Sequence, residues 1–276
     1  MNSSQNASRD LTEIARRIRR ELVEMSHRAR APHLGSCLSC VDILVAAYWS
    51  VLDVNPTQPA ADARDRLILS KGHGAAALYA TLAHRGFFPI EDLATFNQPG
   101  SNLPEQPSPG GAPGIEAATG SLGHGLSIGL GMALAARIKR LPYRVLVVLS
   151  DGECNEGAVW EAAMFAGAHQ LSNVVAIVDF NRWQATGRSE EIMAISPLAQ
   201  KFEAFGWSAR EVDGHSIEAL AETMQSAPFD HGKPTALIAR TVKGKGISFM
   251  EDDNNWHYRI PNQDELQAAL EELNGS

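Results

Sequence analysis

Two stretches of sequence decide how this chain folds: Ser150-Asp151-Gly152-Glu153-Cys154-Asn155-Glu156-Gly157 and Val178-Asp179-Phe180-Asn181. An apolar run at 145–149 leads into the first stretch, and a second run at 174–178 leads into the other. Such uninterrupted apolar runs are typical of buried parallel strands, and helical patterning separates the two. Open α/β sheets bind ligands at the carboxyl ends of their strands. We therefore expect Asp151 and Asn181 to lie side by side at that edge.

Asp151 and Asn181 together offer the ligand chemistry of a divalent metal site. Carboxylate and amide oxygens are hard ligands, and a small number of them suits Mg²⁺, which usually completes its octahedron with substrate phosphates and water. Each residue alone has a simpler explanation, because Asp151 could cap a helix and Asn181 could tip a turn. Their shared position favours the metal site, and Gly152 lets the backbone approach a diphosphate closely.

Composition and charge narrow the class of protein. The 276 residues are 44% hydrophobic, which is enough for one large α/β domain spanning 1–276. The formal net charge of −8 argues against a nucleic-acid partner. No apolar run approaches the roughly 20 residues of a membrane span, and the N-terminus lacks the apolar core of a signal peptide. We therefore expect a cytoplasmic protein with no membrane partner.

Alternating strand and helix patterns predict the fold class. We expect strands at 66–69, 145–149, 174–178, 207–212 and 235–240, helices at 10–30, 41–52, 74–84, 119–140, 216–227 and 262–273, a loop at 31–36 and a frayed N-terminus at 1–7. This order predicts an α/β fold with a mostly parallel β-sheet flanked by helices on both faces. The segment 99–114 is dense in Pro, Gly and Ser, and loops of such length inside a domain are usually functional or disordered.

Two local patterns have ordinary explanations. Cys37-Leu38-Ser39-Cys40 spells C-x-x-C, but it lacks a thioredoxin-like setting and a second ligand pair for zinc, so we expect small core residues near a helix start. Four arginines interleave with apolar residues at helical spacing: Arg16, Arg17, Arg19 and Arg20. We interpret them as a solvated helix face rather than as a phosphate or membrane patch.

The opening stretches resemble the thiamine-diphosphate (ThDP) fingerprint, a Gly-Asp-Gly followed at a distance by Asn, with Ser150 in place of the first glycine. Further blocks are similar to those of transketolases and follow in the same order: Leu69-Ser70-Lys71-Gly72-His73-Gly74, Gly114-Ile115-Glu116-Ala117-Ala118-Thr119-Gly120-Ser121-Leu122-Gly123, and Lys243-Gly244-Lys245-Gly246 through Trp256-His257. The resemblance covers nearly the whole chain. It implies the ThDP-binding fold, in the form of the diphosphate-binding domain.

The resemblance also implies roles for individual residues. It assigns the metal (Mg²⁺, or Ca²⁺ or Mn²⁺ in its place) to Asp151, Asn181 and the backbone carbonyl of Trp183. It assigns cofactor contacts to Asp151, Gly152, Asn181, Gly120, Leu122, Glu156, His73 and His257. It assigns catalysis to His33, His73, His257 and Glu156, and substrate contacts to His33 and Gln106.

The chemistry explains why such groups are needed. Ketol transfer moves a proton off a sugar hydroxyl and later onto an aldehyde oxygen, and imidazoles near their own pKa serve both directions. In transketolases the glutamate matching Glu156 joins a carboxylate network that crosses the dimer interface. The alternative for Glu156 is a solvated glutamate favoured by the dipole of the helix that follows.

Three positions leave the interpretation open. Transketolases usually carry Gly-His-Pro in the long loop, where this chain has Gln106, and glutamine hydrogen-bonds a hydroxyl without shuttling protons near pH 7. Transketolases usually carry a glutamine after Leu-Gly, and this chain has His124 there. We expect His124 to be a packed histidine rather than a group that compensates for the change at Gln106. Both departures put the ordinary pentose-phosphate substrates in doubt. Lys243 begins either a phosphate-contacting basic loop or a polar surface loop.

One essential group is missing. In transketolases the carboxylate that activates ThDP lies in a second domain, which this sequence lacks, although the protein must supply that group. We therefore expect, in preference to a fragment, the N-terminal subunit of a split transketolase. It would transfer a two-carbon ketol unit from a ketose or ketose phosphate to an aldose or aldose phosphate. A C-terminal partner subunit would complete the active site, in an α2β2 heterotetramer.

Two alternatives remain. The chain could be the α subunit of another ThDP enzyme, of the 2-oxoacid dehydrogenase or decarboxylating synthase type, which shares the metal fingerprint. It could also be a non-catalytic ThDP-binding subunit, which the change at Gln106 would favour.

Overall fold

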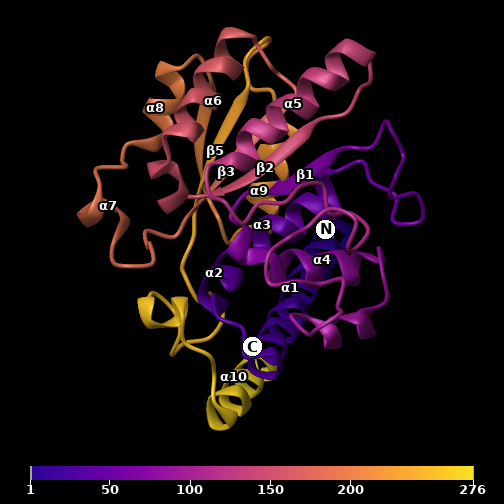
Figure 1. Cartoon of the computed structure of the whole chain (residues 1–276), viewed down its shortest axis with the longest axis vertical. Helices are drawn as coiled ribbons and strands as arrows, with labels where there is room; N and C mark the ends of the chain where they lie inside the picture. The colour runs from indigo at the N-terminus through magenta and orange to yellow at the C-terminus, as the bar shows by residue number, and fades with distance from the viewer. Residues whose placement is uncertain (1, 276) are drawn as a thin grey trace.

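Five parallel strands form one sheet in the computed structural model, which describes residues 2–275, with side chains from Asp10 onward. The strands are β1 (Arg66–Leu69), β2 (Val145–Ser150), β3 (Val174–Phe180), β4 (Ser208–Asp213) and β5 (Thr235–Arg240). Their order across the sheet is β1-β2-β3-β5-β4, and every neighbouring pair is parallel (Figure 1). The predicted fold class is thus confirmed.

The register of β2 and β3 explains how the site is assembled. Val145 pairs with Val174 at the start of the two strands, and Ser150 pairs with Asp179 at their ends. The strands therefore end level with one another. Asp151 and Asn181 leave the sheet at the same edge, as the sequence predicts.

Helices surround this sheet. They are α1 (Asn2–Ala29), α2 (Leu34–Ser39), α3 (Val41–Ala46), α4 (Ala75–Arg85), α5 (His124–Lys139), α6 (Gly157–Ala168), α7 (Ser189–Ile192), α8 (Leu198–Ala204), α9 (Ile217–Gln225) and α10 (Gln263–Gly275). Short 3₁₀ turns cover Gly72–Gly74, Ile90–Thr95, Gly152–Asn155 and Asn254–His257, and a π turn covers Ala47–Val51. None of the helices in residues 2–275 combines the length and the apolar character that crossing a membrane requires.

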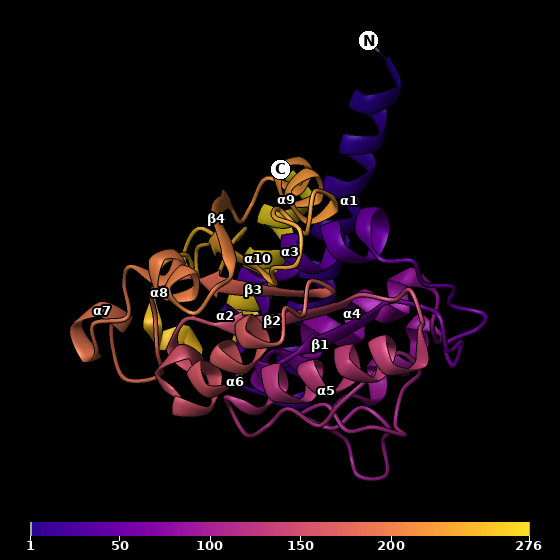
Figure 2. The same cartoon turned by 90° about the horizontal axis from the view of Figure 1, so that it is seen from above.

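Two separate hydrophobic cores fill the two faces of the sheet. Leu146 and Val148 of β2 point into one core, which α1, α3, α4 and α9 cover. Val147 and Leu149 point into the other, which α5, α6 and α8 cover. This alternation is the two-residue period of a strand, and it requires an apolar residue at every position of a strand covered on both faces. Figure 2 shows α5 and α6 on one side of the strands and α1, α3 and α9 on the other.

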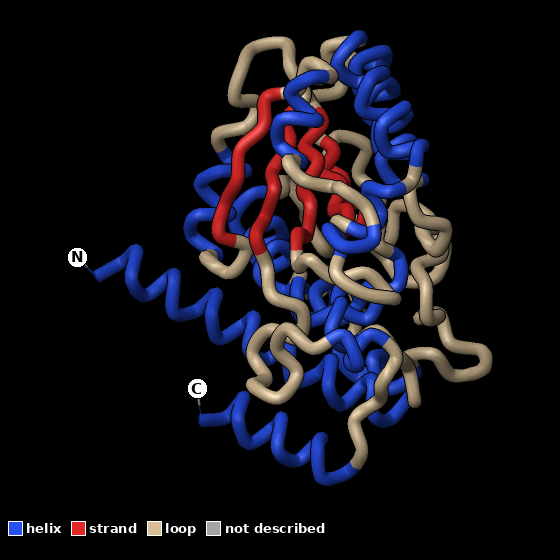
Figure 3. The backbone as a smooth tube through the Cα atoms, turned by 90° about the vertical axis from the view of Figure 1, so that its left-hand side faces the viewer, coloured by secondary structure: helices blue, strands red, loops and turns tan. Residues whose placement is uncertain are grey.

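The first and last helices lie side by side. Figure 3 shows α1 and α10 next to each other beyond the sheet, and Arg16 of α1 donates a hydrogen bond to the carbonyl of Leu273 in α10. Helix α10 confirms the helix predicted at 262–273 within two residues. Helix α1 begins at Asn2 rather than near Asp10. The fraying expected for 1–7 stays a prediction, because the side chains of these residues lie outside the described part of the chain.

Three helix boundaries differ from the prediction for local reasons. Helix α5 begins at His124 rather than Thr119, because Gly123 adopts a left-handed φ of 84° that cannot continue a helix. The helix predicted at 41–52 gives way to the π turn at Ala47. The loop predicted at 31–36 is shorter, since α2 already begins at Leu34.

The two minor sequence patterns have different outcomes. Cys37 and Cys40 are buried free thiols, and burial raises their pKa to about 11 and about 12, so they are inert core residues as expected. The solvated arginine face is only partly confirmed. Arg17 is exposed, but Arg19 is buried and forms an ion pair with Asp42 of α3, with its Nη2 2.6 Å from Oδ2. Helix α1 therefore uses one arginine to attach itself to α3.

Candidate active site

A cavity of about 390 Å³ opens at the carboxyl edge of the sheet. Most of the predicted site residues line it: His33, His73, Gln106, Gly120, Leu122, Gly152, Glu156, Asn181, Trp183 and His257. Asp151 lies beneath this surface and is fully buried. Residues from distant parts of the chain therefore meet in one place, at the position where α/β sheets bind ligands.

Asp151 is held in place by two hydrogen bonds. One carboxylate oxygen accepts the backbone N–H of Gly152 at 2.9 Å, and the other accepts the hydroxyl of Ser189 at 2.7 Å. Burial, with a further contribution from the neighbouring Asp179 carboxylate, raises the pKa of Asp151 to about 6. Asp151 also caps the 3₁₀ turn at Gly152–Asn155. The capping role and the position at the strand end therefore hold together.

Asn181 organises the segment that follows β3. Its side-chain oxygen accepts the backbone N–H of Trp183 at 3.0 Å, and its amide nitrogen lies 3.4 Å from the hydroxyl of Ser39. Within residues 2–275 no group of three or more His, Cys, Asp or Glu side chains is arranged to hold a metal. One carboxylate, one amide and one carbonyl are too few for an all-protein cage. They fit a hard cation that takes its other ligands from a diphosphate and water.

A buried ion pair, not foreseen from the sequence, lies under this edge. Lys71 and Asp179 are both fully buried, with Nζ and Oδ2 2.5 Å apart. Asp179 also accepts the hydroxyls of Ser39 and Thr241. Burial alone would raise the pKa of Asp179, but the Lys71 ammonium and these hydrogen bonds hold it below its usual value. The sequence does contain a sign of this ion pair, because an aspartate near the end of an apolar strand is buried and needs a buried partner.

The three predicted histidines form one cluster. The ring centroid of His33 lies 5.3 Å from that of His73 and 4.9 Å from that of His257. His33 adopts a left-handed φ of 71°, and its buried Nδ1 has no hydrogen-bond partner among the described residues. Its Nε2 lies 3.8 Å from the carboxylate of Glu105 in the long loop.

The protonation of this cluster differs from the expectation. Burial, followed by the nearby charge of Lys243, lowers the pKa of His33, and the same causes lower that of His257 to about 3. Burial and Lys71 lower the pKa of His73 well below its usual value. All three imidazoles are therefore neutral at pH 7 rather than near their own pKa. An anion bound beside the two lysines would raise these pKa values again, because it would screen the positive charge.

Lys243 lies against His257, which lines the cavity, and is not part of a surface loop. It is buried, and its Nζ contacts the side-chain oxygen of Asn254 at 2.8 Å and Nδ1 of His257 at 2.9 Å. Burial and the nearby Lys71 charge lower its pKa to about 8. Both described hydrogen-bond partners are neutral, so this ammonium has no carboxylate in contact with it. A buried cation in that state fits an anionic group such as a diphosphate.

Two glycines allow the walls of the site to approach each other. A Cβ on Gly72 would lie 2.4 Å from the backbone oxygen of Thr119, and one on Gly120 would lie 1.8 Å from the side-chain oxygen of Gln106. Gln106 therefore extends over Gly120 at the position where the resemblance places cofactor and substrate. His124 is exposed at the start of α5, so the expectation of a packed histidine was wrong.

Two glutamates of the opening stretch differ in their surroundings. Glu153 is fully buried and accepts the hydroxyl of Ser70, the N–H of Gly123 at 2.8 Å and the N–H of Ser150 at 3.1 Å. It thereby ties three site segments together, a role that sequence reasoning missed. Glu156 is exposed at the N-terminus of α6 and lines the cavity. Its place in a network across a dimer interface remains a prediction.

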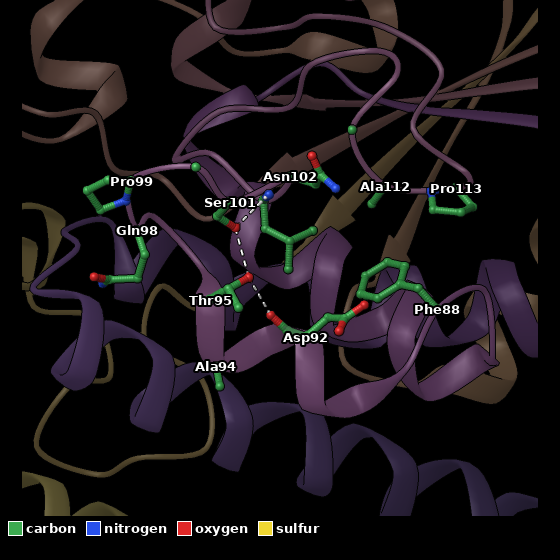
Figure 4. A pocket seen from close by; sticks show the side chains of 13 residues that line it. Phe88, Asp92, Ala94, Thr95, Gln98, Pro99, Ser101, Asn102, Ala112 and Pro113 are labelled. Carbon is green, nitrogen blue, oxygen red and sulfur yellow. Dashed lines mark hydrogen bonds between the residues drawn. The ribbon is translucent and has the colours of Figure 1, made fainter.

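A second cavity, of about 480 Å³, lies outside this site under the long loop (Figure 4). Asp92, Asn102 and Phe88 line it, and a hydrogen bond between the hydroxyls of Thr95 and Ser101 closes one side. Its lining contains none of the predicted site residues and no histidine or lysine among the described residues. We therefore assign the candidate active site to the smaller cavity.

The fold and the cavity together define a parallel α/β protein with a candidate ligand site at the carboxyl edge of its sheet. Comparison with known proteins gives the family: residues 11–274 match the transketolase thiamine diphosphate binding domain. The chain belongs to the transketolase family.

Relatives fall into two groups by length. An apulose-4-phosphate transketolase subunit of Phocaeicola vulgatus is 41% identical over 92% of this chain and 90% of its own. The 6-deoxy-6-sulfo-D-fructose transketolase subunit SqwG of a Clostridium species is 40% identical over 96% of both chains. The transketolase of Rattus norvegicus is 36% identical over 95% of this chain but only 42% of its own length.

The solved structures that match are of the longer group. The transketolase of Pichia stipitis in complex with sedoheptulose 7-phosphate superimposes with a TM-score of 0.90 and 30% identity, over 97% of this chain and 41% of that one. The transketolase of Leishmania mexicana superimposes with a TM-score of 0.89 at 27% identity, again over 41% of its length. This chain thus spans about two fifths of the solved transketolase chains that it matches.

Proposed function

We propose that this chain is the N-terminal subunit of a split, ThDP- and Mg²⁺-dependent transketolase. It would transfer a two-carbon ketol unit from a ketose to an aldose, either of them phosphorylated or not. The observation that carries the proposal is the cavity lined by Asn181 and the histidine cluster, with Asp151 and Lys243 buried next to its lining. Relatives of the same length are named as subunits, which supports a second chain.

In this proposal the metal is held by Asp151, Asn181 and the backbone carbonyl of Trp183. Lys243 and His257 would face the diphosphate, and Gly120 and Leu122 would contact the rest of the cofactor. When bound, ThDP supplies a nucleophilic carbon and an electron sink for carbon–carbon cleavage. The chain itself binds, orients and shields the cofactor from water.

The histidine cluster would handle the substrate protons. As neutral imidazoles, His33 and His73 can accept a proton from a donor hydroxyl, and return it to an aldehyde oxygen in the second half-reaction. Gln106 would orient the donor by a hydrogen bond, without exchanging a proton with it. Glu156 would join the network toward a second copy of this chain.

The partner subunit would supply the activating carboxylate and the groups that select the sugar phosphate. The assembly we propose is an α2β2 heterotetramer in the cytoplasm. The alternative of an α subunit in a 2-oxoacid enzyme is less favoured, because the metal fingerprint alone does not require the contacts among His33, His73 and His257.

The experiment that tests this function is co-expression of the chain with a candidate C-terminal transketolase subunit. Ketol transfer is then assayed with several ketose donors and with pyruvate. The proposal predicts transfer only when both chains are present. Full transfer by this chain alone would refute the split-subunit proposal, decarboxylation of pyruvate would favour the alternative enzyme, and no turnover with any donor would favour a non-catalytic subunit.

A further inference from the structure

Two loops that both line the cavity are joined by one carboxylate. The first loop, 182–188, follows Asn181 and carries Trp183, and the second, 250–258, carries His257. Asp252 in the second loop accepts the indole N–H of Trp183 at 2.8 Å. It also accepts both terminal N–H groups of Arg188, each at 2.7 Å. We call this arrangement the Asp252 latch.

The latch is firmly attached on both sides. The backbone N–H of Asp252 donates to the carbonyl of Lys243 at 2.9 Å, and Asp252 adopts a left-handed φ of 58° that aims its side chain at the first loop. On the other side, the guanidinium of Arg188 lies 3.7 Å from the ring centroid of Trp183. A bidentate pair with a stacked guanidinium is rigid and specific in orientation.

A second bridge runs parallel to the latch. The amide of Asn254 donates to the carbonyl of Ala185 at 3.1 Å, while its oxygen accepts from Nζ of Lys243 at 2.8 Å. The loop next to the predicted metal ligands is therefore connected to the buried ammonium and to His257. The ion pair of the latch lies at the surface, since the side chains of Arg188 and Asp252 are 31% and 43% exposed.

Exposure of this kind limits what the latch does for folding. Surface ion pairs contribute little stability, about 0–1 kcal/mol at the median. The latch instead fixes the position of the Trp183 backbone, two residues after Asn181. Arg182, which lies between these two residues, has a left-handed φ of 66°. A backbone carbonyl binds a metal more tightly when its loop is already held in the binding position.

We propose that Asp252 is a positioning residue that holds the Trp183 loop in its cation-binding position and couples it to the Lys243–His257 side of the cavity. The inference rests on the proposed function, since it concerns the same metal and diphosphate. Groups that orient metal ligands without touching the metal typically change metal affinity by about 10- to 100-fold when they are mutated. We expect the latch to act in this range.

The test compares Asp252→Asn with the unmodified full-length chain, each with the partner subunit, by calorimetric titration of ThDP in the presence of Mg²⁺. Removing the charge weakens both bonds to Arg188, so we expect the dissociation constant to rise about 10-fold or more. Replacing Mg²⁺ by Mn²⁺ gives a second readout, because the electron paramagnetic resonance spectrum of the bound ion reports the geometry of its ligands. Activity at saturating Mg²⁺ and ThDP should recover in the variant.

Asp230→Asn is the matched control. Asp230 is also an exposed, ion-paired aspartate, 3.2 Å from Nζ of Lys233 and bonded to Ser208, but it lies away from the cavity. We expect unchanged affinity in the control and unchanged thermal unfolding of both variants without cofactor. Arg188→Gln should reproduce the defect of Asp252→Asn, and Arg188→Lys should restore part of the affinity.

The outcomes separate the inference from the proposed function. Binding of Mg²⁺ and ThDP by Asp252→Asn within twofold of the unmodified chain overturns the inference and leaves the proposed function intact. Equal losses in Asp252→Asn and Asp230→Asn also overturn it, because they indicate a general charge effect. If the unmodified chain with its partner binds no Mg²⁺ and ThDP, the proposed function fails and the latch assignment fails with it.

Discussion

Replacing Lys71 by methionine removes the ammonium that contacts the buried carboxylate of Asp179. Methionine keeps the length and the apolar stem of the side chain, so the substitution mainly deletes charge. Asp179 would retain the hydroxyls of Ser39 and Thr241 but would lose its ion pair at 2.5 Å. Removing one partner of a buried pair costs about 3–5 kcal/mol, because the other charge stays buried and uncompensated. We expect a loss of this size in the free energy of unfolding at pH 7.

The pH dependence gives this prediction a characteristic sign. In the native chain the pKa of Asp179 is depressed, so its stabilising contribution is present above the unfolded-state pKa of about 3.9 and is lost as the pH falls through the folded-state value. In Lys71→Met, burial acts without the ammonium and raises the pKa of Asp179. The deficit of the variant should therefore shrink as the pH falls from 7 toward about 4, because the folded variant takes up a proton on Asp179 that the unfolded chain does not yet bind.

Urea denaturation followed by circular dichroism between pH 4.5 and 8 measures both effects. A double variant, Lys71→Met with Asp179→Asn, removes the uncompensated charge and should recover more than half of the lost stability. A loss under about 1 kcal/mol in Lys71→Met, the level typical of an exposed ion pair, would show that Lys71 does not compensate the buried charge of Asp179. So would a loss that does not change with pH.

Two further predictions follow from the walls of the cavity. Gly72→Ala should lower the free energy of unfolding by about 1–3 kcal/mol, because the new Cβ meets backbone that cannot move. In Gly120→Ala the new Cβ meets only the flexible end of Gln106, so the free energy of unfolding should be nearly unchanged. Urea denaturation of the two variants side by side checks the contrast. Gln106→His should raise kcat with ketose-phosphate donors by about tenfold or more, since an imidazole can exchange a proton with the donor; an unchanged ratio of kcat/KM values across a donor series would show that position 106 does not contact the donor.

The fold could be predicted from local patterns because a parallel sheet covered on both faces has an unambiguous sequence. The runs at 145–149 and 174–178 are apolar at every position, and each strand has a core on either side. The start of α5 could not be predicted in the same way. The apolar and small residues from Thr119 onward continue the helical pattern, and only the left-handed φ of Gly123 marks the boundary.

The candidate site was predicted where the chain itself brings residues together and missed where tertiary contacts decide. Asp151 and Asn181 follow adjacent strands, so their common edge could be inferred from the sequence. The neutral state of the histidines depends instead on their own burial and then on the nearby charges of Lys71 and Lys243, neither of which a local pattern reveals. Lys243 looked equally like a surface residue, because a Lys-Gly-Lys-Gly run has the composition of a loop whether it is buried or not.

In the proposed function, Asp151 and Asn181 anchor a metal-bound diphosphate at the edge of the sheet. This anchoring is tested by calorimetric titration of ThDP into the unmodified chain and into Asp151→Ala, each together with the partner subunit, first with Mg²⁺ and then with excess chelator. We predict binding by the unmodified chain that requires Mg²⁺ and is abolished by Asp151→Ala. Equal affinity of the two proteins for ThDP, or binding that persists in the chelator, would contradict this account.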